Sequence, residues 1–210
     1  MDGFERRKEQ KKENIRRAAL ELFKIYGVKK VSINDIAGKA AVSPVTIYNH
    51  FGSKEELVRD VVKQLILSLQ EKYQAIIEGE GAFLEKLESI IFDKMEIGRQ
   101  YNQEFIQTAL SNDPEIQQFI DSIWETKVNQ MMIDFFEEGK RQGYINPELA
   151  QDIILLFTDI FRRGIMSRPD LFAAPEHNER LIRELSYLYL YGVMGRRDRD
   201  REYRRTPERS

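Results

Sequence analysis

Apolar residues recur at helical spacing along almost the whole chain, and no stretch alternates polar and apolar residues as a β-strand would. The first apolar stripe falls at i, i+3, i+4, i+7, i+8 and i+11, and consists of Ile15, Ala18, Ala19, Leu22, Phe23 and Tyr26. Such a stripe covers one face of a helix, which has to be buried against another element. The sequence therefore predicts an all-α fold of about nine helices packed on one another.

Capping residues divide this pattern into separate helices. The signals are Gly27 after the first helix, Ser32 and Ser43-Pro44 before the second and third, Ser53 with Glu56 as a capping box before the fourth, and Asp113-Pro114 and Asn146-Pro147 further on. The fourth helix is expected to run to about residue 77. The later helices are expected over 82–99, 102–110, 114–139, 147–164 and 175–194.

Composition narrows the class of protein. The 210 residues include no cysteine, which excludes disulfides and thiolate metal sites. Every apolar run is shorter than the roughly 18–20 residues that cross a bilayer. The charged N-terminus is not followed by the apolar segment of a secretory signal. We therefore expect a cytoplasmic protein.

Charge is distributed unevenly along the chain. Residues 1–63 carry 14 basic and nine acidic side chains, whereas residues 64–195 carry 12 basic and 22 acidic ones. A basic head on an acidic body indicates that only the head faces a polyanion. Residues 196–210 carry seven basic and four acidic side chains with little apolar content, which predicts a disordered tail.

The second and third predicted helices are short and are joined by the tight turn 41–43, with the first helix beside them. This is the pattern of a helix-turn-helix unit. On the third helix, Ile47 and Phe51 lie four residues apart and are expected to face the other two helices. The remaining side chains then project outward, and a DNA major groove about 12 Å wide admits one such helix. The pattern predicts that the third helix contacts DNA.

The stretch VSINDIAGKAAVSPVTIYNHFGSKEELVRDVV, within residues 15–65, resembles the DNA-binding domain of the TetR/AcrR family of regulators. Beyond it, the chain matches the family only in size and helix order. The resemblance implies an N-terminal three-helix DNA-binding domain followed by a C-terminal helical domain that binds an effector and dimerises. We accordingly assign 1–13 to a basic arm, 14–54 to the DNA-binding domain, 55–195 to the effector-binding and dimerisation domain, and 196–210 to the tail.

The resemblance also implies DNA contacts, residue by residue. Phosphate-binding positions fall on Ser32, Thr46, Tyr48, His50 and Lys54, and base-facing positions fall on Pro44, Val45 and Asn49. Many relatives have glycine where this chain has Val45, so the operator sequence does not transfer from them. Simple packing is the alternative role for Tyr48 and His50, and solvation is the alternative for Lys54.

Basic residues before and within the first helix extend this prediction. Lys11, Lys12, Arg16 and Arg17 are expected to contact flanking phosphates or a minor groove. The arginine-rich tail is a weaker candidate, because acidic residues interrupt its basic run.

Two C-terminal helices are apolar over more than one face, and such helices have to be covered on both sides. Packing one side on a second subunit would form a four-helix bundle, as the resemblance also implies. The alternative is that both helices are central in a monomeric bundle. The predicted dimer interface consists of Ile153, Phe157, Ile160, Phe161, Leu181, Leu185, Leu188 and Tyr189.

Aromatic residues are frequent in the middle helices of the body, where the resemblance places an effector pocket. Most aromatic residues at helical spacing belong to a core, but a subset is expected to favour an apolar or aromatic ligand. The candidate pocket residues are Phe92, Arg99, Tyr101, Phe105 and Trp124.

Motifs of catalysis are absent from the sequence. It has no Gly-x-Ser-x-Gly, no Gly-rich phosphate loop, and two histidines, His50 and His177, that are far apart. We predict no catalytic residue, metal or cofactor, and a homodimeric repressor that binds a palindromic operator in double-stranded DNA. One alternative is a DNA-bound scaffold of the same fold that recruits a protein partner and has no effector. Another is a helical enzyme with an incidental turn motif.

Overall fold

The computed structural model describes residues 3–110, 113–172 and 175–193. Its helices are α1 (Gly3–Tyr26), α2 (Ile33–Ala40), α3 (Pro44–Phe51), α4 (Lys54–Glu78), α5 (Phe83–Gln100), α6 (Gln103–Ala109), α7 (Pro114–Ile123), the π-helical turn η1 (Trp124–Val128), α8 (Asn129–Arg141), α9 (Gln151–Met166), the 3₁₀ helix η2 (Pro169–Phe172) and α10 (Pro175–Val193). Because α7, η1 and α8 are continuous, these labels form nine unbroken α-helices in the described part of the chain. The predicted all-α fold is confirmed. The predicted tail 196–210 lies outside the described residues.

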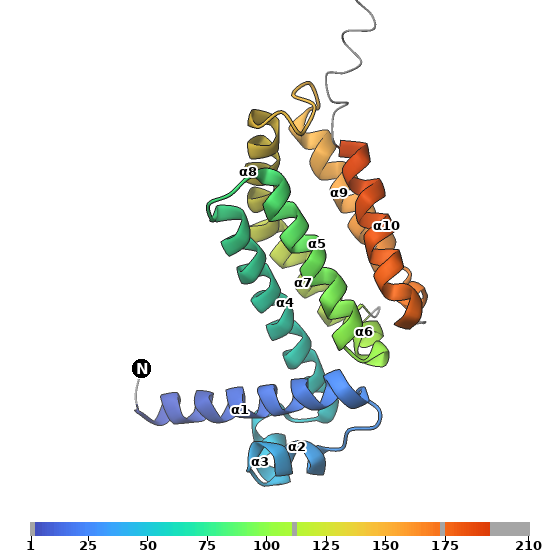
Figure 1. Ribbon diagram of the computed structural model, residues 1–210. Helices are drawn as coiled ribbons and strands as arrows, with labels where there is room; N and C mark the ends of the chain where they lie inside the picture. Colours follow the sequence, from blue (N-terminus) through green and yellow to red (C-terminus); the bar gives the residue numbers. More distant parts are fainter. Residues whose placement is uncertain (1–2, 111–112, 173–174, 194–210) are drawn as a thin grey trace, which may run out of the picture.

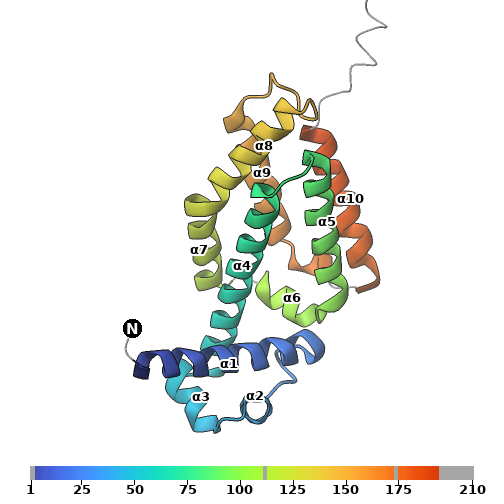
Figure 2. The same ribbon diagram turned by 60° about the vertical axis from the view of Figure 1, so that its left-hand side comes forward.

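The molecule has a small head, α1 to α3, and a larger body, α5 to α10. Figure 1 shows α1 lying across the base, with α2 and α3 beneath it and the body standing above. In both views α4 rises out of the head and runs up into the body (Figures 1 and 2). One rigid element therefore connects the two parts.

Serine caps start α2 and α3 of the head and the connecting helix α4, as predicted. The bonds are Asp35 N to Ser32 Oγ at 3.2 Å, Thr46 N to Ser43 Oγ at 3.1 Å, and Glu56 N to Ser53 Oγ at 3.1 Å. Each satisfies a backbone amide that lacks a partner within its helix. The capping box predicted for α4 is half formed, because the Glu56 carboxylate binds Arg59 instead.

Two elements differ from the sequence prediction. Most of segment 1–13, which we set apart as an arm, forms the first turns of α1. The helix predicted from Pro147 begins at Gln151. Asn146 Oδ1 accepts a bond from Glu148 N at 3.0 Å, so Asn146-Pro147 forms a turn before the helix. An Asn-Pro pair is equally suited to a turn and to a helix start.

The head and body each have a hydrophobic core, and the head core continues into the body. Ile15, Phe23 and Ile47 are fully buried in the head, and Phe105 and Ile116 of the body join the same cluster. The body core is a second cluster formed by Ile77, Phe83, Ile90, Phe135, Phe136, Ile145 and Ile154. The shared cluster means that the head is packed onto the body and not only tethered by α4.

Hydrogen bonds close this contact at the end of α1, in what we call the α1–α6 junction (Lys24–Lys29 with Asn102 and Glu104). Asn102 donates from its backbone N to Lys24 O at 2.7 Å and from Nδ2 to Ile25 O at 3.3 Å. Lys29 N donates to Glu104 Oε1 at 3.0 Å. The start of α6 therefore binds backbone groups that α1 leaves unpaired where it ends.

Gly27 sits inside this junction with a positive φ of 79°, and a Cβ there would lie 2.5 Å from Glu104 Oε2 and 2.8 Å from Asn102 Oδ1. Gly143 has a similar φ of 77° with nothing near its missing Cβ. We predict that Gly143→Ala lowers the free energy of unfolding by about 1–2 kcal/mol, the strain of the left-handed conformation. Gly27→Ala should cost more, because the junction bonds break as well. Urea unfolding measures both losses, and equal losses would contradict this account of the junction.

Candidate nucleic-acid interface

α3 is anchored on its inner face by two apolar side chains. Ile47 is fully buried in the head core, and Phe51 packs against the same cluster while remaining half-buried. Because the two residues lie four apart, they hold one face of α3 against α1 and α2. The opposite face is left free of core packing.

The side chains on this free face are exposed. Val45 is 65% exposed and Tyr48 is 49% exposed, and Asn49, one turn after Val45, is exposed too. Pro44 is half-buried at the start of the helix, and the Thr46 hydroxyl lies 2.9 Å from Ser43 Oγ. The face offers a methyl surface, a phenol and an amide, which are groups that contact thymine methyls, phosphates and base edges.

The two predicted phosphate contacts on either side of α3 have different surroundings. Ser32 is exposed, but its hydroxyl accepts from Asp35 N and donates to Asp35 Oδ2 at 2.6 Å. These bonds also hold the pKa of Asp35 below its ordinary value. Lys54 is half-buried at the first turn of α4. In this structure the Ser32 side chain is thus occupied by the capping box.

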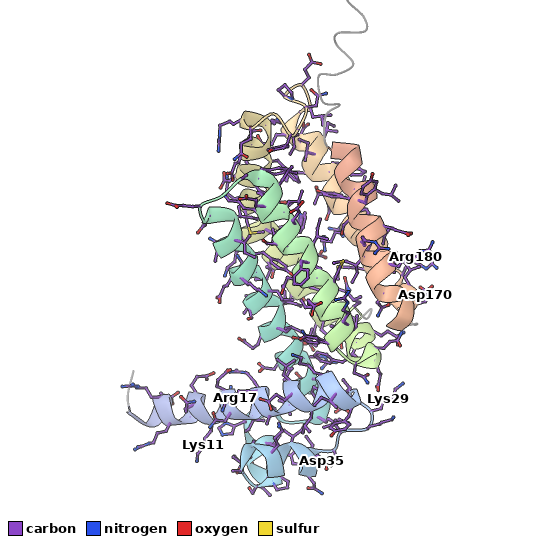
Figure 3. All side chains as sticks on the ribbon, viewed as in Figure 1. Lys11, Arg17, Lys29, Asp35, Asp170 and Arg180 are labelled. Atoms are coloured by element: carbon purple, nitrogen blue, oxygen red, sulfur yellow. The ribbon has the colours of Figure 1, made fainter. Side chains whose placement is uncertain are left out.

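The N-terminal half of α1 brings lysines towards the end of α3. Burial lowers the pKa of His50 below its ordinary value, and the charges of Lys12, Lys8 and Lys11 lower it further. The Lys12 ammonium also lies 5.9 Å from the centre of the Phe51 ring. Figure 3 labels Lys11 on the part of α1 that extends past the other head helices. The positive charge predicted for a basic N-terminal arm is therefore carried on a helix beside the proposed DNA-facing surface.

Arg16 does not belong to this basic surface. Its guanidinium binds Asp60 at 2.5 Å and Glu9 at 2.7 Å, and ties α1 to α4. Lys8 was absent from the sequence prediction, although its position three residues before Lys11 places both on one helix face.

The five candidate pocket residues do not converge on one site. Tyr101 stacks on Phe105 at 6.0 Å, and Phe105 lies 5.8 Å from Phe23 in the cluster shared with the head. Arg99 pairs with Glu96 at 2.7 Å, Phe92 is 59% exposed, and Trp124 lies under the Arg162 guanidinium at 4.8 Å. The aromatic pattern of the sequence correctly predicted that Phe105 is buried. It could not predict which of these side chains lie together in one site.

The predicted dimer residues lie on an uncovered apolar surface of α9 and α10. Ile153, Ile160 and Leu188 are 53%, 59% and 65% exposed, and Phe157 is 39% exposed. Phe161, Leu181, Leu185 and Tyr189 are half-buried. Leu156 and Tyr187, 55% and 56% exposed, add to the uncovered apolar area, and Tyr187 was not predicted to lie in the interface.

Among the described residues, no three His, Cys, Asp or Glu side chains gather as a metal site would require. Within the same ranges, none of the helices combines the length and apolar character needed to cross a bilayer.

A short helix that presents an open polar face above a buried apolar one, braced by two others, defines a helix-turn-helix DNA-binding protein. Residues 15–61 match the family model of bacterial regulatory proteins of the tetR family. This match confirms the resemblance seen in the sequence for the DNA-binding segment. The relatives that the chain resembles are transcriptional regulators and not enzymes, in agreement with the prediction.

Relatives extend the similarity beyond the head. The HTH-type transcriptional repressor KstR2 of Mycolicibacterium smegmatis is 28% identical over 152 residues, which are 70% of this chain and 73% of the relative. FadR of Bacillus halodurans, a fatty acid degradation regulator, has the same fold with a TM-score of 0.61 at 18% identity, covering 89% of this chain and 97% of that one. FadR of Bacillus subtilis in complex with stearoyl-CoA gives a TM-score of 0.59 at 20% identity, covering 86% and 98%.

Substitutions on the free face of α3 should separate affinity from specificity. Tyr48→Phe removes one hydroxyl donor to phosphate and should weaken binding about fivefold on every sequence, or ~1 kcal/mol. Asn49→Ala should cost about 1–3 kcal/mol on the preferred operator and relax the preference at one base position. Fluorescence anisotropy on operator variants measures both effects. Unchanged affinity and unchanged specificity in both variants would contradict the assignment of α3.

The lysines of α1 should contribute to DNA affinity through their charge, without preference for a base sequence. Lys11→Ala is expected to reduce the slope of log affinity against log salt by about 0.9, the value for one phosphate contact. The matched control is Arg141→Ala, which removes an exposed cation at the end of α8. Titrations at several salt concentrations give the slopes, and equal slopes for Lys11→Ala and the unaltered protein would remove Lys11 from the interface.

Proposed function

We propose that this regulator is a homodimeric repressor that binds a palindromic operator and is released by a small apolar or aromatic effector. The observation that carries the proposal is the exposed face of α3 above a fully buried Ile47. A similar protein is described as a transcriptional repressor, and another of the same fold was solved in complex with stearoyl-CoA. The first similarity supports a role as a repressor and not an activator. The second supports an effector with a long apolar chain.

DNA contact is proposed for the residues that the family resemblance carries over. The assigned positions are Ser32, Pro44, Val45, Thr46, Tyr48, Asn49, His50 and Lys54. Val45, Tyr48 and Asn49 supply side-chain contacts from the free face of α3. For Ser32, whose hydroxyl is occupied, the contact would come from the amide end of α2, where the helix dipole favours a phosphate.

Dimerisation is supported by the uncovered side chains of α9 and α10. One head contacts too few phosphates for tight specific binding, and a two-fold pair of heads about 34–36 Å apart meets successive major grooves on one side of the duplex. Burying Ile153, Ile160 and Leu188 against their copies would also remove a large apolar surface from water. The same interface would therefore stabilise the body and set the distance between the heads.

Release by an effector requires two conformations with different head positions. A ligand that binds one conformation better shifts the population towards it and weakens operator binding by the same free energy. Two connections are available to transmit the shift: α4, and the α1–α6 junction with Asn102 and Glu104. Because α6 holds the end of α1, a displacement of α6 would move the head as directly as a tilt of α4.

The operator is the first quantity to establish. Selection of bound duplexes from a random library with the full-length protein should yield an inverted repeat, and an apolar or aromatic compound should both raise the melting temperature and release that duplex. Failure to retain any duplex at low salt would refute DNA binding. Operator binding that no metabolite, drug or cell extract alters would instead favour the scaffold that recruits a protein partner.

A charge within the α9–α10 surface should dissociate the dimer. Ile160→Glu places two carboxylates in a two-fold interface, where an unpaired buried charge costs several kcal/mol. Sedimentation velocity should show a monomer at micromolar concentration and operator affinity should fall. Ile25→Glu, at a similarly exposed residue of α1 (64%), is the control and should remain dimeric. A dimer that persists in Ile160→Glu would place the interface elsewhere.

A further inference from the structure

The helix α7 is tied at its start to the part of α4 that leaves the head. Asp113, the N-cap of α7, accepts a bond from Arg59 Nε of α4 at 2.9 Å. Glu115 pairs with Lys63 of α4 at 3.4 Å. Ile116 is buried and belongs to the hydrophobic cluster that includes the head core. A shift of α7 would therefore displace side chains on which the head rests.

Near its other end, α7 binds α9 through opposite charges. Asp121 Oδ1 accepts a bond from Arg162 Nη2 at 3.0 Å and lies 3.7 Å from Nη2 of Arg163. The Arg162 side chain is 13% exposed and that of Asp121 is 36% exposed. Because Arg162 is largely enclosed, salt and water screen this pair less than a pair on the open surface.

Arg162 is held in place from two further sides. Asp159, one turn earlier on α9, accepts bonds from Arg162 Nε at 3.1 Å and from Nη2 at 2.6 Å. The guanidinium also lies 4.8 Å from the centre of the Trp124 ring of η1. A planar guanidinium that is fixed in this way presents its donors in a defined direction. The bond to Asp121 therefore defines where α7 lies relative to α9.

The contact between the two helices at this point is not closely packed. A recess of about 230 Å³ lies beside the ion pairs, and its lining consists of Gln117, Asp121, Arg162, Arg163, Met166 and Ser167. Close packing of apolar side chains would leave no such space. Mainly polar side chains therefore join α7 to α9 here, and one substitution can weaken the connection without removing part of the hydrophobic core.

The other side of α9 carries the apolar surface proposed for dimerisation. Ile153, Phe157 and Ile160 are exposed there. Arg162 follows Ile160 by two residues, which is a rotation of about 200° around the helix. α9 thus contacts α7 on one side and would contact the second subunit on the other. A series of contacts would then lead from the second subunit through α9 and α7 to the head.

We propose that Asp121 and Arg162 are positioning residues that determine which spacing between operator half-sites the dimer accepts. This rests on the proposed function, since it presumes a dimer formed through α9 and α10 on an inverted repeat. α4 and the α1–α6 junction connect a head to its own body, whereas the bond between Asp121 and Arg162 fixes α7 relative to the dimer helix. Binding of one head to one half-site does not require this bond.

The test measures how strictly the full-length protein selects the distance between half-sites. The selected operator is compared with repeats that have one base pair added or removed, which moves the half-sites by about 3.4 Å. The unaltered protein should bind the selected spacing about tenfold more tightly. Asp121→Asn should reduce this preference to about threefold, since a partly buried ion pair is lost, and should leave the affinity for a single half-site unchanged. Asp121→Glu, which keeps the charge, should retain the preference.

Glu137→Gln is the matched control. It breaks the ion pair between Lys140 and Glu137 at 2.9 Å, which lies within α8 and joins no second helix. Its partners are 13% and 41% exposed, close to the values for Arg162 and Asp121. This variant should select the operator spacing as strictly as the unaltered protein. Fluorescence anisotropy gives the affinities, and sedimentation velocity gives the oligomeric state of each variant.

Three results would overturn the proposal. They are an unchanged spacing preference in Asp121→Asn, an equal loss of preference in Glu137→Gln, and an Asp121→Asn protein that sediments as a monomer, which would assign the residue to dimerisation itself. Failure of the proposed function gives a different result, because the unaltered protein would then bind a single half-site as tightly as the repeat. That outcome would refute the dimeric repressor and this proposal together.

Discussion

Phe105 of α6 packs against Phe23 of α1, and this contact places residues of the body inside the hydrophobic core of the head. Both side chains are fully buried, so separating them would expose two aromatic rings to water. Around them, Asn102 and Glu104 satisfy the backbone at the end of α1. The orientation of the head therefore depends on the body even though, among the described helices, α4 alone runs through both.

This arrangement has a direct consequence for regulation. The face of α3 can bind DNA only in the position that the head core gives it, and that core includes Phe105 and Ile116 of the body. A ligand inside the body need not touch the head to change operator affinity, because any shift of α6 or α7 moves side chains on which the head rests. The apolar surface of α9 and α10 matters for the same reason. If a second subunit packs there, the orientation of the head on each body sets the distance between the two heads of the dimer.

The sequence alone predicted most of the fold, because its signals are local. Helical spacing located the helices, and the hydroxyls of Ser32, Ser43 and Ser53 marked starts that the hydrogen bonds confirm. Ile47 was correctly assigned to the core of the head. The helix start predicted at Asn146-Pro147 was wrong, because the same pair of residues is also typical of a turn. The helix α9 begins at Gln151. What lay beyond prediction depends on contacts distant in sequence: the engagement of Arg16 by Asp60, and the junction of Asn102 with α1.

The central claim is that the free face of α3 lies against the bases of the operator. Photocrosslinking tests it most directly, with a benzophenone amino acid in place of Val45 in the full-length protein and, separately, in place of Ile25, which is as exposed but lies at the other end of the head. The account predicts an efficient crosslink to the selected duplex from position 45 and none from position 25. A crosslink from position 25 without one from position 45 would contradict it.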